Sequence, residues 1–212
     1  MPSLKSILRE VRKELREKEK ARENVQGDMR KVTSLSKQAI LLIHQKRLEG
    51  AKKLIENAKE IISKLNNASA VHPDIVYTGL FNVALQEYSE ANIFLKLIEE
   101  SIFATPKEIG VPSVDYVLGL ADVIGEYRRM ALDALREGDI EKGEKCLRIM
   151  DEIYTELMAM DEAYMLVPGL RRKCDSARRI IEATRGDVTQ EMRRTTLEKH
   201  LKRLERRITK KR

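Results

Sequence analysis

The sequence contains no tryptophan, and aromatic residues of every kind make up only 4% of its 212 residues. Proline and glycine are also scarce, with five and ten copies. This leaves few sites for the tight turns of a hairpin-built sheet, and no stretch of useful length alternates between apolar and polar residues. These absences argue against a β fold and favour long amphipathic helices.

Two further absences concern the cellular compartment. Cys146 and Cys174 are the only cysteines, no secretory signal is recognisable, and no apolar run is long enough to span a bilayer. Disulfide frameworks belong to secreted proteins, and a membrane span needs about 20 apolar residues. We therefore expect two reduced thiols in a cytoplasmic protein that does not associate with a membrane.

Charge is abundant in this chain, and one part of it is strongly basic. Charged residues make up 35% of the sequence and hydrophobic residues 42%, a balance that suits amphipathic helices around a sizeable core. Residues 191–212 hold ten Lys or Arg against three Glu, which accounts for the whole formal net charge of +7. A basic segment suits a polyanion such as nucleic acid, but a solvated terminal helix without a ligand explains it equally well.

Apolar residues recur at helical spacing in about seven segments, and no internal repeat or linker divides the chain. The predicted helices span residues 3–49 with a bend near 27, 50–65, 74–102, 114–136, 139–166, 170–184 and a last stretch after 187. We therefore predict an all-α, single-domain bundle. Its helical body covers residues 1–187, and a basic C-terminal helix covers residues 188–212.

The helix predicted over residues 74–102 carries a carboxylate inside its apolar stripe. At about 100° per residue, Glu87 falls at the centre of the stripe and Glu90, one turn on, at its edge. Burying a carboxylate is costly unless it gains a proton, a cationic partner or a metal ion. A buried ion pair with Lys or Arg and a metal-binding or acid–base site remain equally compatible with this pattern.

A second set of acids recurs at steps of seven, four and seven in the helix predicted over residues 114–136. Its members are Asp115, Asp122, Glu126 and Asp133. They share about 40° of arc beside an apolar face, and like charges at i, i+4 are unfavourable without a counterion. Such a stripe is most often simply solvated. Facing Glu87 and Glu90, it would instead complete a cluster of carboxylates.

Motifs of several other enzyme classes are missing. No histidine has Glu three residues earlier, neither cysteine has zinc-finger spacing, and no Gly-x-Ser-x-Gly elbow occurs. What remains is a set of oxygen ligands from two helices, which selects hard ions such as Mg²⁺ or Mn²⁺. Such ions commonly assist the hydrolysis of phosphodiesters, and basic residues elsewhere would hold the polyanion.

Three segments, residues 36–44, 85–91 and 114–126, the last followed by Gly138-Asp139, form a distinctive set. In these segments the chain resembles the translin family, and within it the branch of translin-associated factor X (TRAX). The similarity covers about residues 15–187. It implies a seven-helix fold that assembles into a hollow homo-octameric barrel. It also implies Mg²⁺-dependent endoribonuclease activity on single-stranded RNA inside that barrel.

The resemblance also assigns roles to individual residues. The catalytic and metal-binding carboxylates of the family fall on Glu87, Glu90, Asp122 and Glu126. Translin itself lacks these acids and binds nucleic acid without cutting it, so their presence favours the catalytic branch. The basic cluster that translin uses for RNA has no clean match before Phe81. Candidate RNA contacts are instead Arg22, Arg30 and Lys37.

Three functions follow from these observations, and we expect the first. It is a Mg²⁺- or Mn²⁺-dependent endoribonuclease that acts as a homo-oligomer on single-stranded RNA. The second is a non-catalytic protein of the translin type that binds single-stranded RNA or DNA, with its acids held in ion pairs. The third is a helical scaffold whose last helix docks a partner through a short coiled-coil seam, formed by Leu197, Leu201, Leu204 and Ile208.

Overall fold

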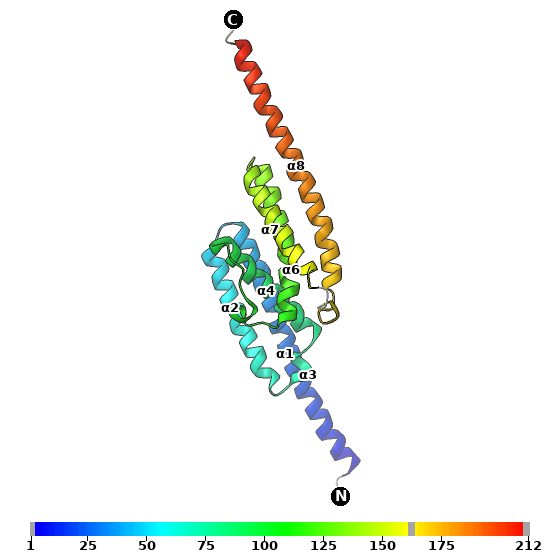
Figure 1. Ribbon diagram of the computed structural model, residues 1–212. Coiled ribbons are helices and arrows are strands. Elements are labelled where there is room, and N and C mark those ends of the chain that lie inside the picture. The colour runs from blue at the N-terminus through cyan, green and yellow to red at the C-terminus, as the bar shows by residue number, and fades with distance from the viewer. Residues whose placement is uncertain (1–2, 161–163, 210–212) are drawn as a thin grey trace. The chain divides into compact units, whose positions relative to one another are not determined.

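The computed structural model describes residues 3–160 and 164–209, and the regular structure in this part of the chain is helical. Figure 1 shows its eight α-helices, which are α1 (Leu4–His44), α2 (Leu48–Ser69), α3 (Pro73–Val76), α4 (Gly79–Glu100), α5 (Pro106–Ile109), α6 (Ser113–Arg136), α7 (Ile140–Met158) and α8 (Leu170–Thr209). Because these described residues contain no strand, the predicted all-α class is confirmed.

The helices form two compact units, residues 1–119 and residues 120–212, and α6 passes from the first into the second. In the first unit, α2 and α4 pack against α1. In the second unit, α7 packs against α8, and Gly143 of α7 lies close to Leu135 of α6. Each unit therefore has its own hydrophobic core.

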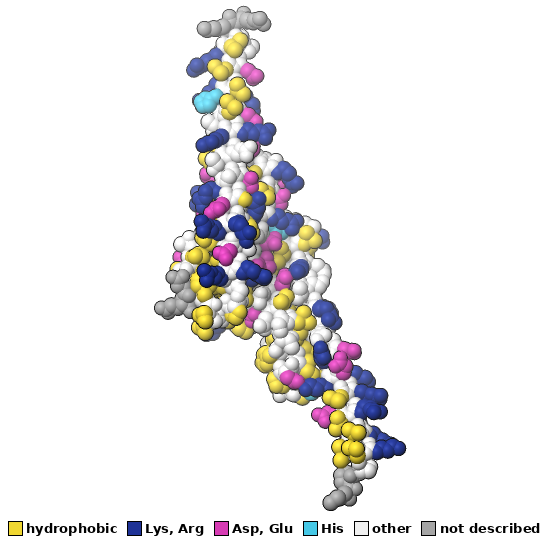
Figure 2. Space-filling view, turned by 90° about the vertical axis from the view of Figure 1, so that its right-hand side faces the viewer, with side chains coloured by type: hydrophobic (Ala, Val, Ile, Leu, Met, Phe, Trp, Pro, Cys, Tyr) yellow, Lys and Arg dark blue, Asp and Glu magenta, His cyan; other side chains and the backbone are white. Residues whose placement is uncertain are grey.

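The long helix α1 is buried along its C-terminal half only. Its buried positions are spaced mostly by three or four residues, and they are Val25, Met29, Val32, Ser36, Ala39, Ile40 and Ile43. The helix continues through Gly27 without a break. Residues 3–20 are exposed and carry a seam of hydrophobic side chains, shown in yellow along this part of α1 in Figure 2.

The helix predicted over residues 74–102 is divided in the structure. The single turn α3 ends at Val76, Tyr77 leaves the helical region with a ψ of 75°, and Thr78 is extended. Helix α4 therefore begins at Gly79, five residues later than the sequence pattern indicates. It ends where Ser101 adopts the left-handed conformation with a φ of 58°. Both Glu87 and Glu90 remain within α4, so the prediction fails at the start of the helix and not at the acids.

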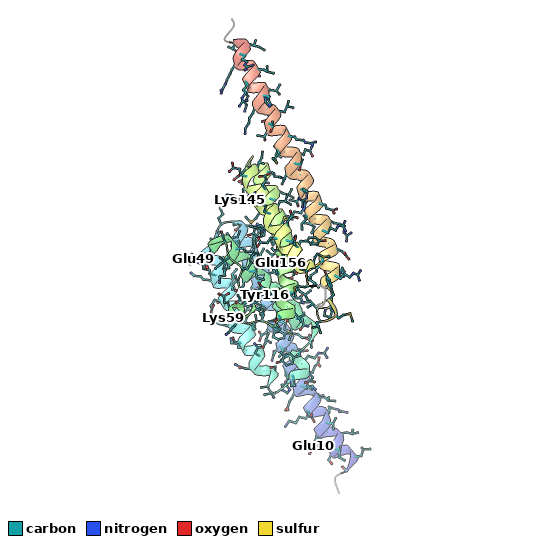
Figure 3. All side chains as sticks on the ribbon, viewed as in Figure 1. Glu10, Glu49, Lys59, Tyr116, Lys145 and Glu156 are labelled. Carbon is teal, nitrogen blue, oxygen red and sulfur yellow. The ribbon has the colours of Figure 1, made fainter. Side chains whose placement is uncertain are left out.

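The segment between α4 and α6 is tied down at both ends. Thr105 and Glu108 form a reciprocal capping box at the start of α5, and Lys96 of α4 donates to Glu108 at 2.8 Å. The Lys96 ammonium and the capping bonds lower the pKa of Glu108 to about 2. Tyr116, labelled in Figure 3, donates from its hydroxyl to the Ala104 carbonyl at 2.7 Å. This segment is therefore held against both neighbouring helices.

Helix α7 is shorter than the sequence pattern predicts. Gly138 adopts a φ of 81°, and Asp139 then caps the helix by accepting from the Lys142 amide at 3.0 Å. The helix was expected to continue to residue 166 but ends at Met158. In the described part of the predicted extension, Met165 is 90% and Leu166 76% exposed, so apolar residues there do not mark a buried helix face. Residues 161–163 of the predicted helix lie outside the described residues.

Helix α8 is longer than expected, since the predicted break at Gly186-Asp187 does not occur. The continuity of α8 is explained by hydrogen bonds from the neighbouring helix α6. Arg128 of α6 donates to the Thr184 hydroxyl at 2.7 Å and to the Asp187 carboxylate at 3.3 Å. These two contacts lie on either side of Gly186 and offset its low helix propensity. The predicted boundary at 187/188 consequently falls inside a continuous helix.

Two expectations about the compartment can be compared with the structure. Cys146 and Cys174 are free thiols, as predicted, and both are buried. Burial raises the pKa of the Cys146 thiol to about 11. Among the residues that the structure describes, no helix combines the length and the apolar character that crossing a membrane requires.

Candidate functional site

Helix α4 carries two of the four predicted acids, and their burial differs from the helical-wheel prediction. Glu90 is buried, with 7% of its surface exposed, whereas the Glu87 side chain keeps 21% exposed. The wheel placed Glu87 at the centre of the buried stripe and Glu90 at its edge, and this order is wrong. It is reversed because α6 packs on the side of α4 that carries Glu90.

A lysine from α1 neutralises Glu87. The Lys37 ammonium lies 3.1 Å from a carboxylate oxygen of Glu87. The Lys37 side chain is 62% exposed, so water screens much of this attraction. Exposed ion pairs typically contribute less than about 1 kcal/mol. The pair therefore balances the charge of Glu87 only weakly, and a more highly charged cation could replace the ammonium.

Gly119 brings the backbones of α4 and α6 together beside Glu90. A Cβ atom added at Gly119 would lie 2.7 Å from the Gln86 carbonyl oxygen and 3.0 Å from the Glu90 amide nitrogen. Facing it is Ser89, a small buried residue whose hydroxyl donates to the Leu85 carbonyl at 2.7 Å. Only glycine fits such a close approach, so Gly119 sets how near the first turns of α6 lie to α4.

Asp122 and Glu126 lie on α6 beyond Gly119, in the second unit. They are three and seven residues after Gly119, which places all three near one face of this helix. Lys173 of α8 donates from its ammonium to both carboxylate oxygens of Asp122, and the bond to Oδ1 is 2.6 Å long. Glu126 is half-buried. Each of the two acid pairs thus includes one carboxylate that a lysine neutralises.

The remaining acids of the predicted stripe on α6 have different surroundings. Asp115 is buried, with only 4% of its surface exposed, and burial raises its pKa. Asp133 forms an exposed ion pair with Arg136 at 3.2 Å. The stripe is therefore not a uniformly solvated face. Its first member is enclosed by protein, and its last is an ordinary surface residue.

The structure describes the two acid pairs on separate units. Glu87 and Glu90 lie one turn apart on α4, while Asp122 and Glu126 lie one turn apart on the part of α6 that belongs to the second unit. Within the described ranges, no group of three or more His, Cys, Asp or Glu side chains is arranged to hold a metal ion.

The three candidate RNA contacts all lie on α1 and are exposed. Arg22 lies 3.7 Å from Glu19 in a weak surface pair. Lys37 forms an ion pair with Glu87, so its ammonium does not face solvent alone. Other cationic side chains follow α8, where Lys and Arg (dark blue) are frequent in Figure 2.

Sequence reasoning missed two residues that matter here. Lys173 and Asp122 lie 51 positions apart, and the sequence carries no signal of their contact. The buried state of Asp115 was hidden for a different reason. Its place at the first turn of α6 is typical of an acid that simply faces the helix dipole in water, so nothing in the pattern indicated burial.

A model of the translin family matches residues 20–206, which is most of the chain. The chain belongs to the translin family. The match includes α4, α6 and both acid pairs, and it leaves most of the exposed N-terminal part of α1 outside.

Individual relatives within the translin family extend this finding. An uncharacterized protein of Methanocaldococcus jannaschii is 33% identical over 193 residues, covering 90% of this chain and 85% of the relative. Two solved structures of AfC3PO, one of them in complex with duplex RNA, are each 36% identical with a TM-score of 0.76. Each covers 87% of this chain and 96% of its own.

A third solved structure, apo-NeC3PO, is 24% identical with a TM-score of 0.74 and covers 90% of this chain and 98% of its own. At that identity the likeness supports the fold alone. The three structures together confirm the predicted translin-like helical fold.

Proposed function

We propose that this translin-family chain is a Mg²⁺- or Mn²⁺-dependent endoribonuclease of the TRAX-like branch, working as a homo-oligomer with an octameric barrel as the expected assembly. The observation that carries the proposal is the pairing of acids. Two helices each present two carboxylates one turn apart, and a displaceable lysine neutralises one acid of each pair.

The donor set fits a hard divalent ion. All four side chains offer carboxylate oxygens, the ligand type that Mg²⁺ and Mn²⁺ prefer. The residues that would hold the ion are Glu87, Glu90, Asp122 and Glu126. When bound, such an ion polarises phosphoryl oxygens and lowers the pKa of the attacking water.

The two lysines give the proposed site a second function. While Lys37 and Lys173 pair with Glu87 and Asp122, they balance negative charge that would otherwise repel RNA. If these carboxylates held an ion instead, both ammonium groups would be available to contact phosphate oxygens of a bound strand, which would make Lys37 one of the RNA contacts.

RNA as the ligand has support from the relatives and from charge. One AfC3PO structure contains duplex RNA, and that protein is 36% identical to this chain. The basic residues of this chain are concentrated in its last 22 residues, where counterion release would favour a polyanion. We propose single-stranded RNA as the substrate that is cut, and duplex RNA is the necessary comparison because of the AfC3PO complex.

The ion pairs also favour a second candidate function. If Lys37 and Lys173 stay bound to their acids in the assembled protein, two of the four carboxylates are unavailable to a cation. The chain would then be a non-catalytic RNA-binding protein of the translin type. Binding without cutting, at every divalent-ion concentration, would identify this alternative.

Cleavage of labelled RNA distinguishes the two candidates. The purified chain is incubated with single-stranded and duplex RNA in Mg²⁺, in Mn²⁺ and in EDTA. We expect cutting of the single strand that requires the ion and is abolished in Glu87→Gln, with RNA binding retained. The matched control is Glu100→Gln, an exposed acid at the end of the same helix. Equal cutting by Glu87→Gln and wild type would rule out the site.

A further inference from the structure

Two exposed stretches of helix carry apolar rows with the same spacing. On α1 the row, which we call the N seam, consists of Leu4, Leu8, Val11 and Leu15. On α8 the row, which we call the C seam, consists of Leu197, Leu201, Leu204 and Ile208. Both step by four, three and four residues, the spacing of a coiled-coil contact, and each spans about 17 Å of its helix. The two seams can therefore interdigitate layer by layer.

Neither seam is covered by the described residues of a single copy. The side chains of the N seam are between 43% and 72% exposed, and those of the C seam are between 50% and 66% exposed. Figure 2 shows hydrophobic side chains (yellow) along both of these helix ends. A row of large apolar side chains at this spacing is costly to leave in water, and a helix with a matching row can cover it. Each seam therefore has room for a partner helix.

Both seams lie on helices that are already formed. Helix α1 runs without a break from the N seam to its buried positions, which begin at Val25. Helix α8 runs from its last buried position, Val188, to the C seam. Isolated helices shorter than about 12–15 residues are marginal in water, and a contact of four layers is short. Because the cores hold both helices, docking would not carry the entropic cost of forming them.

An antiparallel arrangement of the two seams has one favourable register. Its four layers pair Leu4 with Ile208, Leu8 with Leu204, Val11 with Leu201 and Leu15 with Leu197. One more layer would place Lys18 against Arg194, and these like charges limit the contact to the four apolar layers. A slip of one heptad would instead set Lys18 and Arg22 against leucines of the C seam. The two seams thus match in length as well as in spacing.

Charged residues beside the two seams match in the same register. In an antiparallel coiled coil, the residues that flank each layer meet across the seam and set the partner. The flanking pairs are Lys5 with Glu205, Arg12 with Glu198, Glu14 with His200, and Ile7 with Arg207. Three of these pairs join an acid to a basic side chain, and the fourth brings no like charges together. Glu198 also pairs with Arg194 at 3.5 Å, a weak surface contact that docking can replace.

Pairing of like seams is disfavoured by the same residues. Two N seams packed antiparallel would place Lys5 against Arg12. Two C seams would place Glu198 against Glu205. A parallel pair of one N seam and one C seam would set Lys5 beside Arg193. Like charges at such positions act against a wrong partner or orientation, so the flanking residues select the antiparallel pair of unlike seams.

We propose that the N seam of one copy packs antiparallel against the C seam of a second copy. The match to the translin family model begins at residue 20, so the N seam lies outside the part of the chain that the model covers. The proposal goes beyond the ribonuclease function, because this contact requires neither RNA nor a divalent ion. Each copy carries both seams, so the contact can repeat until the assembly closes.

Disulfide cross-linking between two differently tagged full-length chains tests the proposal. One chain carries Leu8→Cys and the other Leu204→Cys, two positions that share a layer in the proposed register. The chains are co-expressed, purified in EDTA without RNA, and oxidised. Cys146 and Cys174 are buried, so they do not compete. We expect a linked pair of unlike chains on a non-reducing gel, and its absence overturns the proposal.

Two controls define what the cross-link means. Lys13 is exposed on the side of α1 away from the N seam, so Lys13→Cys should not link to Leu204→Cys. Two differently tagged chains that both carry Leu8→Cys should not link either, because like seams repel. Linking in either control as strong as in the test pair contradicts the proposal.

A charge exchange tests whether the flanking residues direct the contact. Adding Arg12→Glu to the chain with Leu8→Cys should reduce the linked fraction several-fold. Adding Glu198→Arg to the chain with Leu204→Cys should then restore it. A linked fraction that neither substitution changes rejects the proposed register.

A single chain that carries both Leu8→Cys and Leu204→Cys identifies the alternative within one copy. We expect this chain to form linked species of higher mass. A disulfide confined to the monomer, with no link between the two singly substituted chains, would show that the seams meet within one copy and would overturn the proposal.

Discussion

Lys173 donates to both carboxylate oxygens of Asp122, which lies 51 positions earlier in the chain. The contact joins α8 to α6 within the second unit. The Asp122 side chain is 38% exposed and that of Lys173 24%, so the pair is partly screened by water. This lysine therefore balances the charge of Asp122, and in the proposed site it would compete with a divalent ion.

Replacing Lys173 by Met should separate these two roles. Without the ammonium, Asp122 loses its counterion, and we expect the melting temperature in EDTA to fall by about 2–4 °C. We also expect Mg²⁺ to stabilise this variant at a several-fold lower concentration than wild type, because its competitor is gone. Thermal unfolding across a Mg²⁺ series measures both effects.

The control for this prediction is Lys145→Met, which removes an exposed lysine from α7 (labelled in Figure 3). It should leave the Mg²⁺ dependence as in wild type. If Lys173→Met shows the wild-type Mg²⁺ midpoint as well, Asp122 does not contribute to an ion site.

Gly119→Ala should destabilise the fold strongly, because the new methyl group would lie 2.7 Å from the Gln86 carbonyl oxygen. Overpacking of this kind typically costs about 1–3 kcal/mol in the free energy of unfolding. Gly125→Ala, six residues later in α6, meets nothing within 4 Å. It should be neutral or stabilising by about 0.5–1 kcal/mol, because alanine favours the helix. Urea denaturation measures the stability of both variants. Similar stabilities would contradict the close approach of α6 to α4 at Gly119.

A third substitution tests the continuity of α8. Since Gly186 lies in a helix with open space around its Cβ position, Gly186→Ala should stabilise the protein by about 0.5–1 kcal/mol. Gly138→Ala is the contrasting variant, because a φ of 81° strains any side chain and should cost about 1 kcal/mol. A helix that ended at Gly186 with a left-handed glycine would make both substitutions destabilising.

The sequence alone was sufficient for the fold class and for most helix positions, because apolar spacing is a local property. It failed where distant contacts decide the outcome. Gly186 and Asp187 have the composition of a helix end, yet Arg128, more than 50 residues away, holds the helix together across them. In the opposite direction, α7 stops at Met158, and Met165 and Leu166 beyond it are exposed although the sequence pattern placed them in the helix.

For the candidate site, too, the sequence indicates local features but not contacts between distant residues. The acids on α4 and α6 were identifiable from their spacing and from the family resemblance. Their surroundings were not, because Lys37 and Lys173 come from other helices and the burial of Glu90 depends on the approach of α6 at Gly119. The burial of Asp115 could not be predicted for the same reason, because it depends on how other elements pack around it.

The exposed C-terminal part of α8 can either contact RNA or dock a second copy of the chain, and two variants distinguish these roles. Replacing Lys199, Lys202 and Arg203 by Gln keeps the apolar seam but removes three charges. If this segment contacts RNA, the plot of log affinity against log salt should become shallower by about two to three units. Replacing Leu201 and Leu204 by Ala is the companion variant, and it should lower the oligomer mass if the seam docks a second copy. A salt slope equal to that of wild type in the Gln variant would exclude this segment from the RNA interface.

Direct binding of Mn²⁺ to the RNA-free protein tests the central claim that the acids of α4 and α6 hold one divalent-ion centre. Electron paramagnetic resonance reports the free ion during titration. We predict saturable binding by wild type and by Glu100→Gln, and its loss in both Glu87→Gln and Asp122→Asn, which lie on different helices. Mn²⁺ binding that is absent from wild type, or unchanged in either of those two variants, would contradict the claim.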